Sequence, residues 1–456
     1  MATVTFLVAP GGVPRGRIRA PGDKSISHRA IMLGSIAEGV TTIDGFLEGE
    51  DCLATLRAFR AMGVRIDGPD RGRVTVHGVG LHGLRAPTGP LDMGNSGTSM
   101  RLMAGILAGQ RFDTVLTGDT SLTRRPMRRV TEPLASMGAR IETTATGAAP
   151  LRIHGGQRLA GIDYRLPMAS AQVKSCLLLA GLYAEGTTRV TEPAPTRDHT
   201  ERMLEGFGYP VQREGEDTDR RVVGLGYPVQ RGERTFVVTG GGRLTATMID
   251  VPSDISSAAF FLVGASITPG ADLLLEHVGV NPTRTGVIGI LQLMGADIEP
   301  RNRRLAGGEL VADLRVRHAP LRGIRIPETL VPLAIDEFPA LFIAAACAEG
   351  ETVLTGAEEL RVKESDRIQV MADGLTALGI AARPTPDGIV IRGSALSGGT
   401  VDSHGDHRVA MSFAMAALRA GGPIAIRDCA NVNTSFPGFV TLARNVGLTI
   451  GEQTTT

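Results

Sequence analysis

The chain has 456 residues, with 48 Lys and Arg against 47 Asp and Glu and a formal net charge of +1. At roughly 150 residues per domain, this length predicts two or three domains, each with a core of its own. The near-neutral balance excludes a protein that holds nucleic acid or an anionic membrane through a global field, so any anion site must be local.

The spacing of the cysteines and the pattern of the N-terminal residues indicate the cellular compartment in which the protein is expected. Cys52, Cys176, Cys347 and Cys429 lie far apart, without a C-x-x-C pair. This pattern excludes a zinc ribbon or a disulfide scaffold and is typical of a reducing environment. The sequence shows neither the charged-then-apolar order of a signal peptide nor an apolar run of about 18 residues. We therefore expect a soluble, cytoplasmic protein.

A helix that ends in glycine and passes into a short strand recurs along the chain. The copies are AMGVRI (61–66), SMGARI (136–141), GFGYPV (206–211), LMGADI (293–298), ALGIAA (377–382) and NVGLTI (445–450). Gly after the last helical turn is typical of a left-handed C-cap, and the strand changes the period from 3.6 to 2. A second glycine turn between these corners completes a unit of strand, helix, strand, helix, strand, which repeats six times.

Six such units are too many for one core and predict two lobes of three units each. We expect the break near TMIDVPSD (247–254) and a second chain crossing near residues 20–22. The predicted domains are residues 1–21 plus 252–456, a discontinuous lobe one, and residues 22–251, lobe two. A single elongated solenoid is less favoured because the loops after the strands carry many unmatched polar residues. A tandem echo, GYPVQR at 208–213 and again at 226–231, predicts a surface hairpin inserted at 208–233 without a catalytic role.

The first dense motif is PGDKSISHRAIMLGSIA at 21–37. Asp23 or Ser25 can cap a helix there, and helical spacing places Lys24 beside His28 and Ser25 beside Arg29. Cations at a helix N-terminus oppose the dipole unless an anion joins them. We therefore favour an anion site over a solvated basic edge.

Two further motifs of the first half repeat this arrangement. GNSGTSMRLMAGILAG at 94–109 offers Asn95 and Gly97 before a helix that begins near Thr98, although the glycines alone fit a structural turn equally well. PMASAQVKS at 167–175 offers Ser170 and Gln172, neutral donors that suit a hydroxylated ligand. Between them, the run TRRPMRR places four arginines before a helix that Pro126 opens, and spacing alone does not choose among Arg124, Arg125, Arg128 and Arg129.

The second half adds carboxylates. Asp336 and Glu337 stand at the polar start of the apolar run AIDEFPALFIAAACA, where a plain helix cap is an alternative. In RVKESDR, the three side chains Lys363, Glu364 and Arg367 fall within one predicted turn, and a surface salt bridge would explain the last two equally well.

A last motif, HGDHRVAMSF, starts another helix with Asp406, His407 and Arg408. His404 and His407 resemble a metal pair, but no third ligand is nearby in the sequence, and we expect no metal.

The repetition of these motifs favours a functional interpretation over a structural one. Helix starts in both halves of the chain carry side chains that bind anions, and we expect these starts to meet in one cleft. Its cations would be Lys24, Arg29, Arg125, Arg367 and Arg408. Asp336 and Glu364 would stay ionised among them and could act as bases.

In chain order, the motifs PGDKSISHR, GNSGTSMRL, TRRPM, PMASAQVKS, TRDHTE, NPTRTG, RVKESDR and GDHRVAMSF resemble those of the 5-enolpyruvylshikimate-3-phosphate synthase family, over essentially the whole chain. The resemblance implies an α/β (α+β) fold, a two-lobed inside-out barrel with three βαβαββ repeats per lobe and the site in the interlobe cleft. It also implies transfer of the enolpyruvyl group of phosphoenolpyruvate to the 5-hydroxyl of shikimate 3-phosphate, by addition and elimination of phosphate.

By the same resemblance we expect no cofactor, the two phosphorylated substrates as the only partners, no nucleic acid, no membrane and a monomer. The residues implied for shikimate 3-phosphate are Lys24, Ser25, Arg29, Ser170, Gln172, Arg197, Asp336 and Lys363. Those implied for phosphoenolpyruvate are Lys24, Asn95, Gly97, Arg125, Gln172, Arg367 and Arg408. The implied catalytic residues are Asp336 at the reacting hydroxyl, Glu364 at the methylene carbon and Lys24, which shares proton transfer.

Two positions refine the resemblance. Thr434, in NTSFPGF, stands where one branch of the family has Lys, so the chain looks like the second class of these synthases. Members of that class often tolerate glyphosate, helped by Ala at the position of Gly97. Because the methyl is absent here, we expect an inhibitor that mimics phosphoenolpyruvate to fit better than it would beside Ala.

Two other functions compete with this interpretation. UDP-N-acetylglucosamine enolpyruvyl transferase shares the fold and donor, but usually carries Lys-Asn in the first motif and Cys, sometimes Asp, in the mobile loop. This chain has Lys24-Ser25, and residues 110–129 contain no Cys. A non-catalytic anion-binding protein would not need Asp336 and Glu364.

Overall fold

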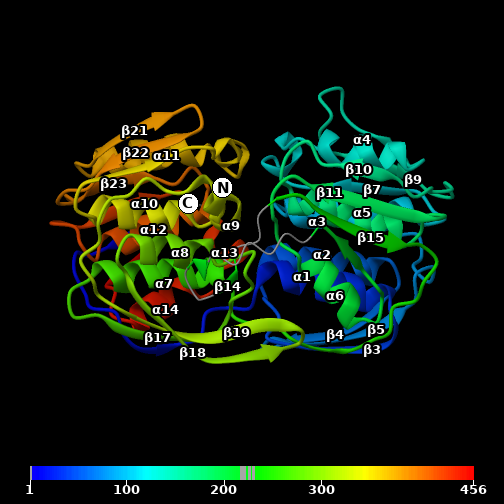
Figure 1. Cartoon of the computed structure of the whole chain (residues 1–456), viewed down its shortest axis with the longest axis horizontal. Coiled ribbons are helices and arrows are strands. Elements are labelled where there is room, and N and C mark those ends of the chain that lie inside the picture. Colours follow the sequence, from blue (N-terminus) through cyan, green and yellow to red (C-terminus); the bar gives the residue numbers. More distant parts are fainter. Residues whose placement is uncertain (1–2, 216–221, 224–226, 229–231, 456) are drawn as a thin grey trace.

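Two lobes lie side by side in the computed structural model, each around a hydrophobic core of its own (Figure 1). The structure describes residues 3–215, 222–223, 227–228 and 232–455. The core of lobe two is built from buried residues between Ile26 and Val251. The core of lobe one takes its residues from Phe6 to Ala20 and from Ile255 to Ile450.

Lobe two consists of three units that follow one another in the sequence. The first contains α1 (Lys24–Ile36), β3 (Glu38–Asp44), α2 (Glu50–Ala61), β4 (Arg65–Asp70), β5 (Arg73–Val79) and, from the end of the lobe, β16 (Met248–Asp250). The second contains β6 (Leu91–Asp92), α3 (Gly97–Ala108), β7 (Thr114–Thr117), the 3-10 helix η1 (Leu122–Arg124), α4 (Arg128–Ser136), β8 (Arg140–Glu142) and β9 (Leu151–His154). The third contains β10 (Asp163–Arg165), α5 (Ala171–Gly181), β11 (Thr187–Glu192), α6 (His199–Gly206), β12 (Gln212–Glu214) and β15 (Arg234–Thr239).

Lobe one repeats the plan with strands from both ends of the chain. Its first unit contains β2 (Arg15–Ile18), α7 (Ile255–Ile267), β17 (Asp272–Gly279), α8 (Gly286–Leu293), β18 (Asp297–Ala306) and β19 (Glu309–Arg317). The second contains η2 (Glu328–Leu330), α9 (Val331–Ala334), α10 (Phe338–Cys347), β20 (Glu351–Leu354), η3 (Glu358–Val362), α11 (Arg367–Ala377), β21 (Ala381–Thr385) and β22 (Gly388–Arg392). The third contains β23 (Gly399–Asp402), α12 (His407–Ala416), β24 (Ile424–Arg427), α13 (Val432–Ser435), α14 (Phe439–Asn445), β25 (Ile450–Thr455) and β1 (Thr3–Val8).

The sheets of these units share one topology. In five of the described sheets a parallel pair is followed by two antiparallel pairs, as in the order β16-β3-β5-β4. The sheet β20-β22-β21 has three strands, and a parallel bridge from Arg325 to Val353 stands where the others have a first strand. The predicted corner glycines all have a left-handed φ, between 77° and 108°: Gly63, Gly138, Gly208, Gly295, Gly379 and Gly447. The six-unit prediction is confirmed.

The helices of each lobe lie inside and the sheets outside (Figure 1). In lobe two, α3 packs against both α1 and α5, and in lobe one α7, α10 and α12 pack against one another. All residues of α7 are buried. A helix that is apolar all round must be covered on every side, which explains why the sheets surround the helices, as the family resemblance implied.

The chain crosses between the lobes at two neighbouring places. One crossing joins β2 to α1 and the other joins β16 to α7. The backbone N–H of Asp23 donates to the Pro252 carbonyl at 2.8 Å, and the N–H of Asp254 donates to the Pro21 carbonyl at 2.9 Å. The two crossing segments are therefore bound to each other as an antiparallel pair.

The predicted insertion at 208–233 falls partly outside the described residues. Within the described part, β12 joins the third sheet of lobe two, and β13 (Val222–Val223) pairs antiparallel with β14 (Tyr227–Pro228). The second GYPVQR copy extends beyond the described residues at 229–231, so the structure gives no description of that end.

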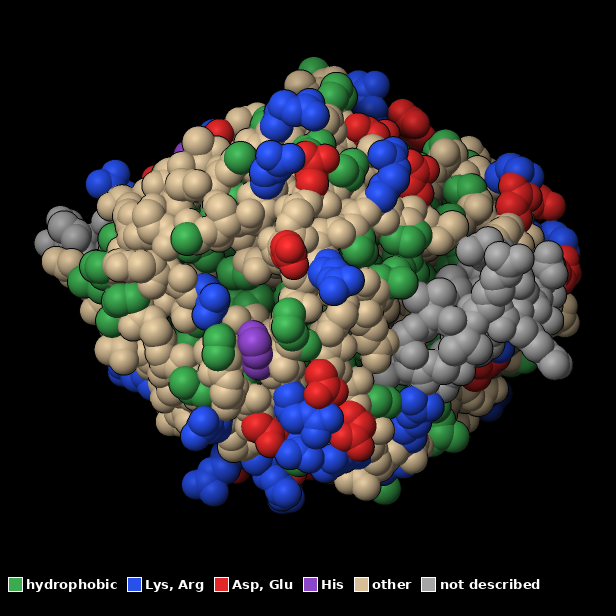
Figure 2. Space-filling model, turned by 60° about the vertical axis from the view of Figure 1, so that its left-hand side comes forward, with side chains coloured by type: hydrophobic (Ala, Val, Ile, Leu, Met, Phe, Trp, Pro, Cys, Tyr) green, Lys and Arg blue, Asp and Glu red, His purple; other side chains and the backbone are tan. Residues whose placement is uncertain are grey.

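The outer face of lobe one carries basic and acidic side chains next to one another (Figure 2). On the β17–β19 sheet, Arg315 lies 2.6 Å from Asp272, and Arg317 lies 2.7 Å from Asp297. The charges on this sheet are thus paired, which matches the near-zero net charge of the chain.

Candidate active site

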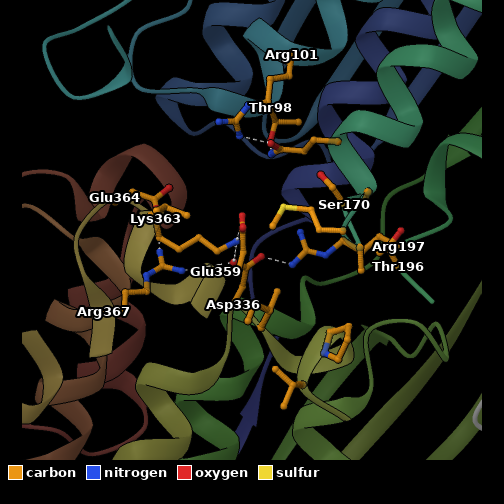
Figure 3. Close-up of a pocket in the computed structure, with 18 of the residues that line it drawn as sticks. Thr98, Arg101, Ser170, Thr196, Arg197, Asp336, Glu359, Lys363, Glu364 and Arg367 are labelled. Carbon is orange, nitrogen blue, oxygen red and sulfur yellow. Dashed lines mark hydrogen bonds and ion pairs between the residues drawn. The ribbon is translucent and has the colours of Figure 1, made fainter. Parts of the chain in front are cut away.

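A cavity of about 600 Å³ lies between the lobes and is lined by side chains from both (Figure 3). Its polar lining from lobe two consists of Lys24, Ser25, Thr98, Arg101, Arg125, Arg129, Ser170, Gln172, Thr196 and Arg197. The charged lining from lobe one consists of Asp336, Glu358, Glu359, Lys363, Glu364, Arg367 and Arg408, with His407 beside them. The lobes thus bring together motifs more than 300 residues apart, as the repetition of helix starts predicted.

Helix N-termini face this cavity from both lobes. Lys24 begins α1, Arg367 begins α11, and Thr98, Gln172 and Arg408 each lie second in their helices. The caps are side-chain oxygens: Asp23 accepts from Ile26 N at 2.9 Å, Ser96 from Ser99 N at 3.1 Å and Asp406 from Arg408 N at 2.9 Å. The helix ends add partial positive charge to the basic side chains, so the cavity attracts anions.

Asp336 stands where the two lobes meet. Its carboxylate pairs with Arg197 of lobe two and lies 3.5 Å from Lys363 Nζ and 3.4 Å from Arg367 Nη1. Burial would raise the pKa of Asp336, but Lys363, Arg197, Arg408 and Arg367 outweigh burial and hold the pKa well below its usual value. Asp336 is therefore ionised and able to accept a proton at neutral pH.

Glu364 contacts the Arg367 guanidinium, as Asp336 does. Its Oε2 lies 2.6 Å from Arg367 Nη2, and its Oε1 lies 3.4 Å from Arg125 Nη1 of lobe two. Burial again opposes ionisation, but Arg367 and Arg125 keep the pKa of Glu364 well below its usual value. Arg367 thus contacts Asp336 through Nη1 and Glu364 through Nη2, while its Nε donates to Asp406 at 2.8 Å.

One local detail of the prediction is wrong. Lys363 and Glu364 do not share a helical turn with Arg367, because α11 begins at Arg367 and the preceding loop carries the other two. Asp366 sets this boundary, since its side chain accepts a hydrogen bond from Gln369 N at 3.0 Å. The ion pair of Glu364 with Arg367 forms across the cap instead.

Arg125 is held by Asn95, another residue that the resemblance implied for phosphoenolpyruvate. Its Nη2 donates to Asn95 Oδ1 at 2.6 Å, while Asn95 Nδ2 donates to Asp119 at 2.7 Å. Asn95 and Gly97 lie behind Arg125 and outside the lining. A Cβ added at Gly97 would lie 3.2 Å from Arg125 Nη1, so the glycine leaves room for this guanidinium.

Lys24 also bridges the lobes. Its Nζ donates to Asp51 at 3.0 Å and to Ser435 Oγ of α13 at 3.2 Å. Ser435 follows Thr434, the position where one branch of the family carries Lys, so this departure lies close to Lys24.

Arg29 lies behind the first turn of α1 and outside the lining. Its guanidinium donates to the Ser25 carbonyl at 3.0 Å, to Thr200 Oγ1 at 2.6 Å and to Ser175 Oγ at 2.8 Å. A direct contact of Arg29 with a ligand stays a prediction, and the observed contacts show that it holds Ser25.

The sequence reasoning missed two arginines of the lining. Arg101 pairs with Gln172, and burial, followed by the charges of Arg129 and Arg125, lowers the pKa of Arg101 to about 10. Arg101 lies one turn after Thr98, and this spacing was the available signal. Arg129 forms a 3.2 Å ion pair with Glu359 across the lobes, whereas Arg124 and Arg128 of the same run are exposed.

His407 was also missed, because its sequence suggested only a metal pair with His404. His407 lines the cavity, while His404 is largely exposed beside Asp402. Burial, and then the charge of Lys24, lowers the pKa of His407 to about 3, so its imidazole is neutral. Among the described residues its Nε2 has no hydrogen-bond partner, and this atom is buried from solvent.

A family model described as EPSP synthase (3-phosphoshikimate 1-carboxyvinyltransferase) matches residues 8–442. The chain belongs to the EPSP synthase family. It is 71% identical over 447 residues to the 3-phosphoshikimate 1-carboxyvinyltransferase of Methylococcus capsulatus, with 98% of each chain covered. It is 70% identical to the protein of the same name from Alkalilimnicola ehrlichii, which covers 98% of this chain and 96% of that one.

A solved structure of EPSP synthase from Acinetobacter baumannii shows the same architecture. It superposes with a TM-score of 0.86 at 59% identity and covers 99% of this chain and 100% of its own. The expected fold class, the two-lobed α/β architecture, is confirmed. Members of the family use phosphoenolpyruvate and shikimate 3-phosphate as substrates.

Proposed function

We propose that the chain carries out the reaction of its family in the cavity between the lobes. The enzyme is a transferase of the shikimate pathway and of aromatic amino-acid biosynthesis. It transfers the enolpyruvyl group of phosphoenolpyruvate to the 5-hydroxyl of shikimate 3-phosphate and releases phosphate. The observation that carries the site assignment is the pair of ionised carboxylates, Asp336 and Glu364, held on one arginine among cations from both lobes.

Shikimate 3-phosphate would bind mainly to lobe two. Ser25, Ser170 and Gln172 supply neutral donors, and Arg197, whose Nη1 lies 3.5 Å from Ser25 Oγ, supplies a cation beside them. Lys363 reaches from lobe one and contacts Asp336. Hydroxyl and amide donors suit a hydroxylated ring, while Arg and Lys neutralise its phosphate and carboxylate.

Phosphoenolpyruvate would lie between Arg125 and the pair formed by Arg367 and Arg408. Arg125 is preorganised by Asn95, and Arg408 donates to the backbone carbonyl of Asp336 at 3.0 Å. Lys24 stands where α1 meets α13, close enough to serve either substrate.

The two carboxylates would divide the proton transfers. Asp336 accepts the proton of the 5-hydroxyl as its oxygen attacks the central carbon of phosphoenolpyruvate, while the methylene carbon gains a proton from the Lys24 ammonium. The resulting tetrahedral ketal then loses that methyl proton to Glu364, and phosphate leaves. Arg367 contacts both carboxylates, which supports a placement of the two bases on either side of the reacting carbon. The proton on Glu364 then returns to Lys24, and the proton taken up by Asp336 leaves with phosphate.

We propose lobe boundaries at residues 1–21 plus 252–456 and at 22–251. The two separate cores and the paired crossing segments at Pro21 and Pro252 support this division. We also propose a cytoplasmic monomer. The four cysteines are free, as is typical of a reducing compartment. The helices in the described ranges include none long and apolar enough to cross a membrane.

Phosphate release tests this function. With phosphoenolpyruvate present, the purified protein should release phosphate in proportion to added shikimate 3-phosphate and give 5-enolpyruvylshikimate 3-phosphate as the second product. UDP-N-acetylglucosamine in place of shikimate 3-phosphate should give none. Release with that acceptor, or binding of both substrates without any release, would overturn the proposal.

A further inference from the structure

Arg284 occupies the junction of the two chain crossings. It belongs to the motif NPTRTG, lies in the loop before α8, and its side chain is only 4% exposed. Its Nη1 donates to Asp23 Oδ2 at 3.0 Å, and its Nη2 donates to Asp254 Oδ1 at 3.1 Å. Asp23 belongs to one crossing segment and Asp254 to the other, so a single guanidinium ties both.

Both carboxylates are also helix caps. Asp23 Oδ1 accepts from Ile26 N at the start of α1, and Asp254 Oδ1 accepts from Ser256 N, 2.8 Å away, at the start of α7. The backbone N–H of Lys24 lies 3.4 Å from Asp254 Oδ2. The position of Arg284 therefore fixes where the first turn of α1 begins, and that turn presents Lys24 and Ser25 to the cavity.

A second branch runs from Arg284 toward Asp336. Arg284 Nη2 donates to Ser256 Oγ at 2.7 Å, and Ser256 Oγ in turn donates to the carboxylate of Glu337. Glu337 precedes α10 and is the chain neighbour of Asp336. Because Glu337 is 3% exposed and hydrogen-bonded in this way, the turn that carries Asp336 is anchored to the same arginine.

The loop around Arg284 is itself fixed to lobe two. Asn281 Nδ2 donates to Asp198 Oδ1 at 2.7 Å, and Asp198 follows Arg197 in the chain. Arg284 Nη1 also lies 3.4 Å from His199 Nε2. Burial alone would lower the pKa of Arg284, but Asp23, Asp254 and Glu337 raise it, so the guanidinium stays charged.

We propose that Arg284 is a positioning residue for the reaction. It sets the distance between the anion-binding turn at Lys24 and Ser25 and the base Asp336 through two separate branches, one through Asp23 and one through Ser256 and Glu337. It touches neither substrate. The planar fork of Arg is required, because a Lys ammonium is a single point charge and does not bridge two carboxylates in a fixed geometry.

The inference rests on the proposed function, and turnover by the unsubstituted enzyme tests that function separately. Each variant below would be purified, its folded fraction measured, and its kcat and its KM values for both substrates determined per folded molecule. Arg284→Lys should lower kcat/KM by roughly 10- to 100-fold, since a displacement of about 1 Å can cost 10²-fold in rate. Wild-type kcat and KM in folded Arg284→Lys would overturn the proposal.

The two branches give a readout that a purely structural role would not give. Asp23→Asn keeps an oxygen to cap α1 but loses the charge that faces Arg284, so it should raise KM with little change in kcat. Ser256→Ala removes the hydroxyl that joins Arg284 to Glu337 and leaves only their direct 3.8 Å ion pair, so it should lower kcat with little change in KM. A raised KM in Asp23→Asn together with a lowered kcat in Ser256→Ala supports the proposal even where Arg284→Lys fails to fold. Unchanged constants in both variants, or the same constant changed in both, would overturn it.

Arg315→Lys is the matched control. Arg315 forms a two-pronged pair with Asp272 in the same lobe, at 2.8 and 2.6 Å, and lies outside the cavity lining. This variant should keep both kcat and KM. A loss equal to that of Arg284→Lys would show that any disrupted ion pair in lobe one slows the enzyme, and would contradict the assignment.

Discussion

Lobe two lines the cavity with cations, hydroxyls and an amide, whereas lobe one supplies all the carboxylates found in the lining of the described chain. From lobe two come Lys24, Arg125 and Arg197, with Ser25, Ser170 and Gln172 between them. From lobe one come Asp336, Glu358, Glu359 and Glu364. Both lobes have the same fold topology, so the difference lies in the side chains at their helix starts and not in the backbone.

This contrast separates two tasks. A surface of cations and neutral donors binds anions but accepts no proton, and isolated carboxylates would repel the same anions. Where the surfaces meet, Arg197 pairs with Asp336 and Arg125 with Glu364. A cation of the opposite lobe thus adds to the effect of Lys363 on Asp336 and of Arg367 on Glu364, and both bases stay ionised. Substitutions on the two sides should therefore have different kinetic effects.

The largest effect is expected on the lobe-one side. Asp336→Asn and Glu364→Gln keep the size of the side chain but remove the proton acceptor. Because general base catalysis contributes roughly 10²- to 10⁴-fold, kcat should fall by that factor, with a smaller change in KM. Steady-state phosphate release measures this.

Glu358→Gln is the control for these variants. Glu358 also lines the cavity but lies at the exposed start of η3, and we give it no role in proton transfer. Its kcat should stay unchanged. A folded Asp336→Asn or Glu364→Gln enzyme with wild-type kcat would remove the catalytic role from that residue.

On the lobe-two side, Arg125→Gln should raise KM for phosphoenolpyruvate more than it lowers kcat. A hydrogen bond to a charged group contributes about 1.5–3 kcal/mol, so the increase in KM should be roughly 10- to 100-fold. The exposed neighbour Arg124 gives a matched control, since Arg124→Gln removes the same charge from the same run. Equal effects of the two substitutions would mean that overall charge, and not this contact, binds the substrate.

A smaller and more selective effect is expected at Gly97. The methyl of Gly97→Ala would lie 3.2 Å from Arg125 Nη1, closer than ordinary contact, so the guanidinium must shift. Overpacking of this kind costs about 1–3 kcal/mol, and we expect a several-fold higher KM for phosphoenolpyruvate and a larger rise in the inhibition constant of glyphosate. Inhibition curves at fixed phosphoenolpyruvate measure both. An unchanged inhibition constant would contradict the account of Gly97.

The smallest effect concerns pH. Burial raises the pKa of Asp336, and Lys363 is the first of the cations that lower it, so the folded pKa lies below the usual value. A base with a lowered pKa is active above that pKa and loses activity as the pH falls through it. Lys363→Met should raise the pKa and move the acid limb of log kcat/KM to higher pH, whereas Lys363→Arg should leave it in place. A limb that stays in place in Lys363→Met would show that Lys363 does not control Asp336.

The repeats could be predicted from the sequence because their signals are local. A glycine such as Gly63 or Gly447 ends a helix through its own backbone conformation, and a cap such as Asp23 needs only the next few residues. The plan that the six units share then follows from the burial of their hydrophobic side chains. These features require no knowledge of the rest of the chain.

The residues that the sequence reasoning missed depend on distant contacts. Arg129 lines the cavity because Glu359 lies across from it, and Arg124 does not, yet both belong to the same run of arginines. His407 is neutral because the fold buries it beside Lys24, which its helix does not reveal. Spacing along a helix shows which side chains share a face, but only the packing of the lobes decides which face meets the cavity.

A structure with shikimate 3-phosphate and glyphosate bound together would test the central claim most directly, namely that both lobes act on both substrates in one cavity. We predict the shikimate ring against Ser25, Ser170 and Arg197, with its 5-hydroxyl within about 3.2 Å of the Asp336 carboxylate. Glyphosate should lie between Arg125 and Arg367, next to Glu364. Ligands bound to one lobe alone, or a 5-hydroxyl directed away from Asp336, would contradict the account.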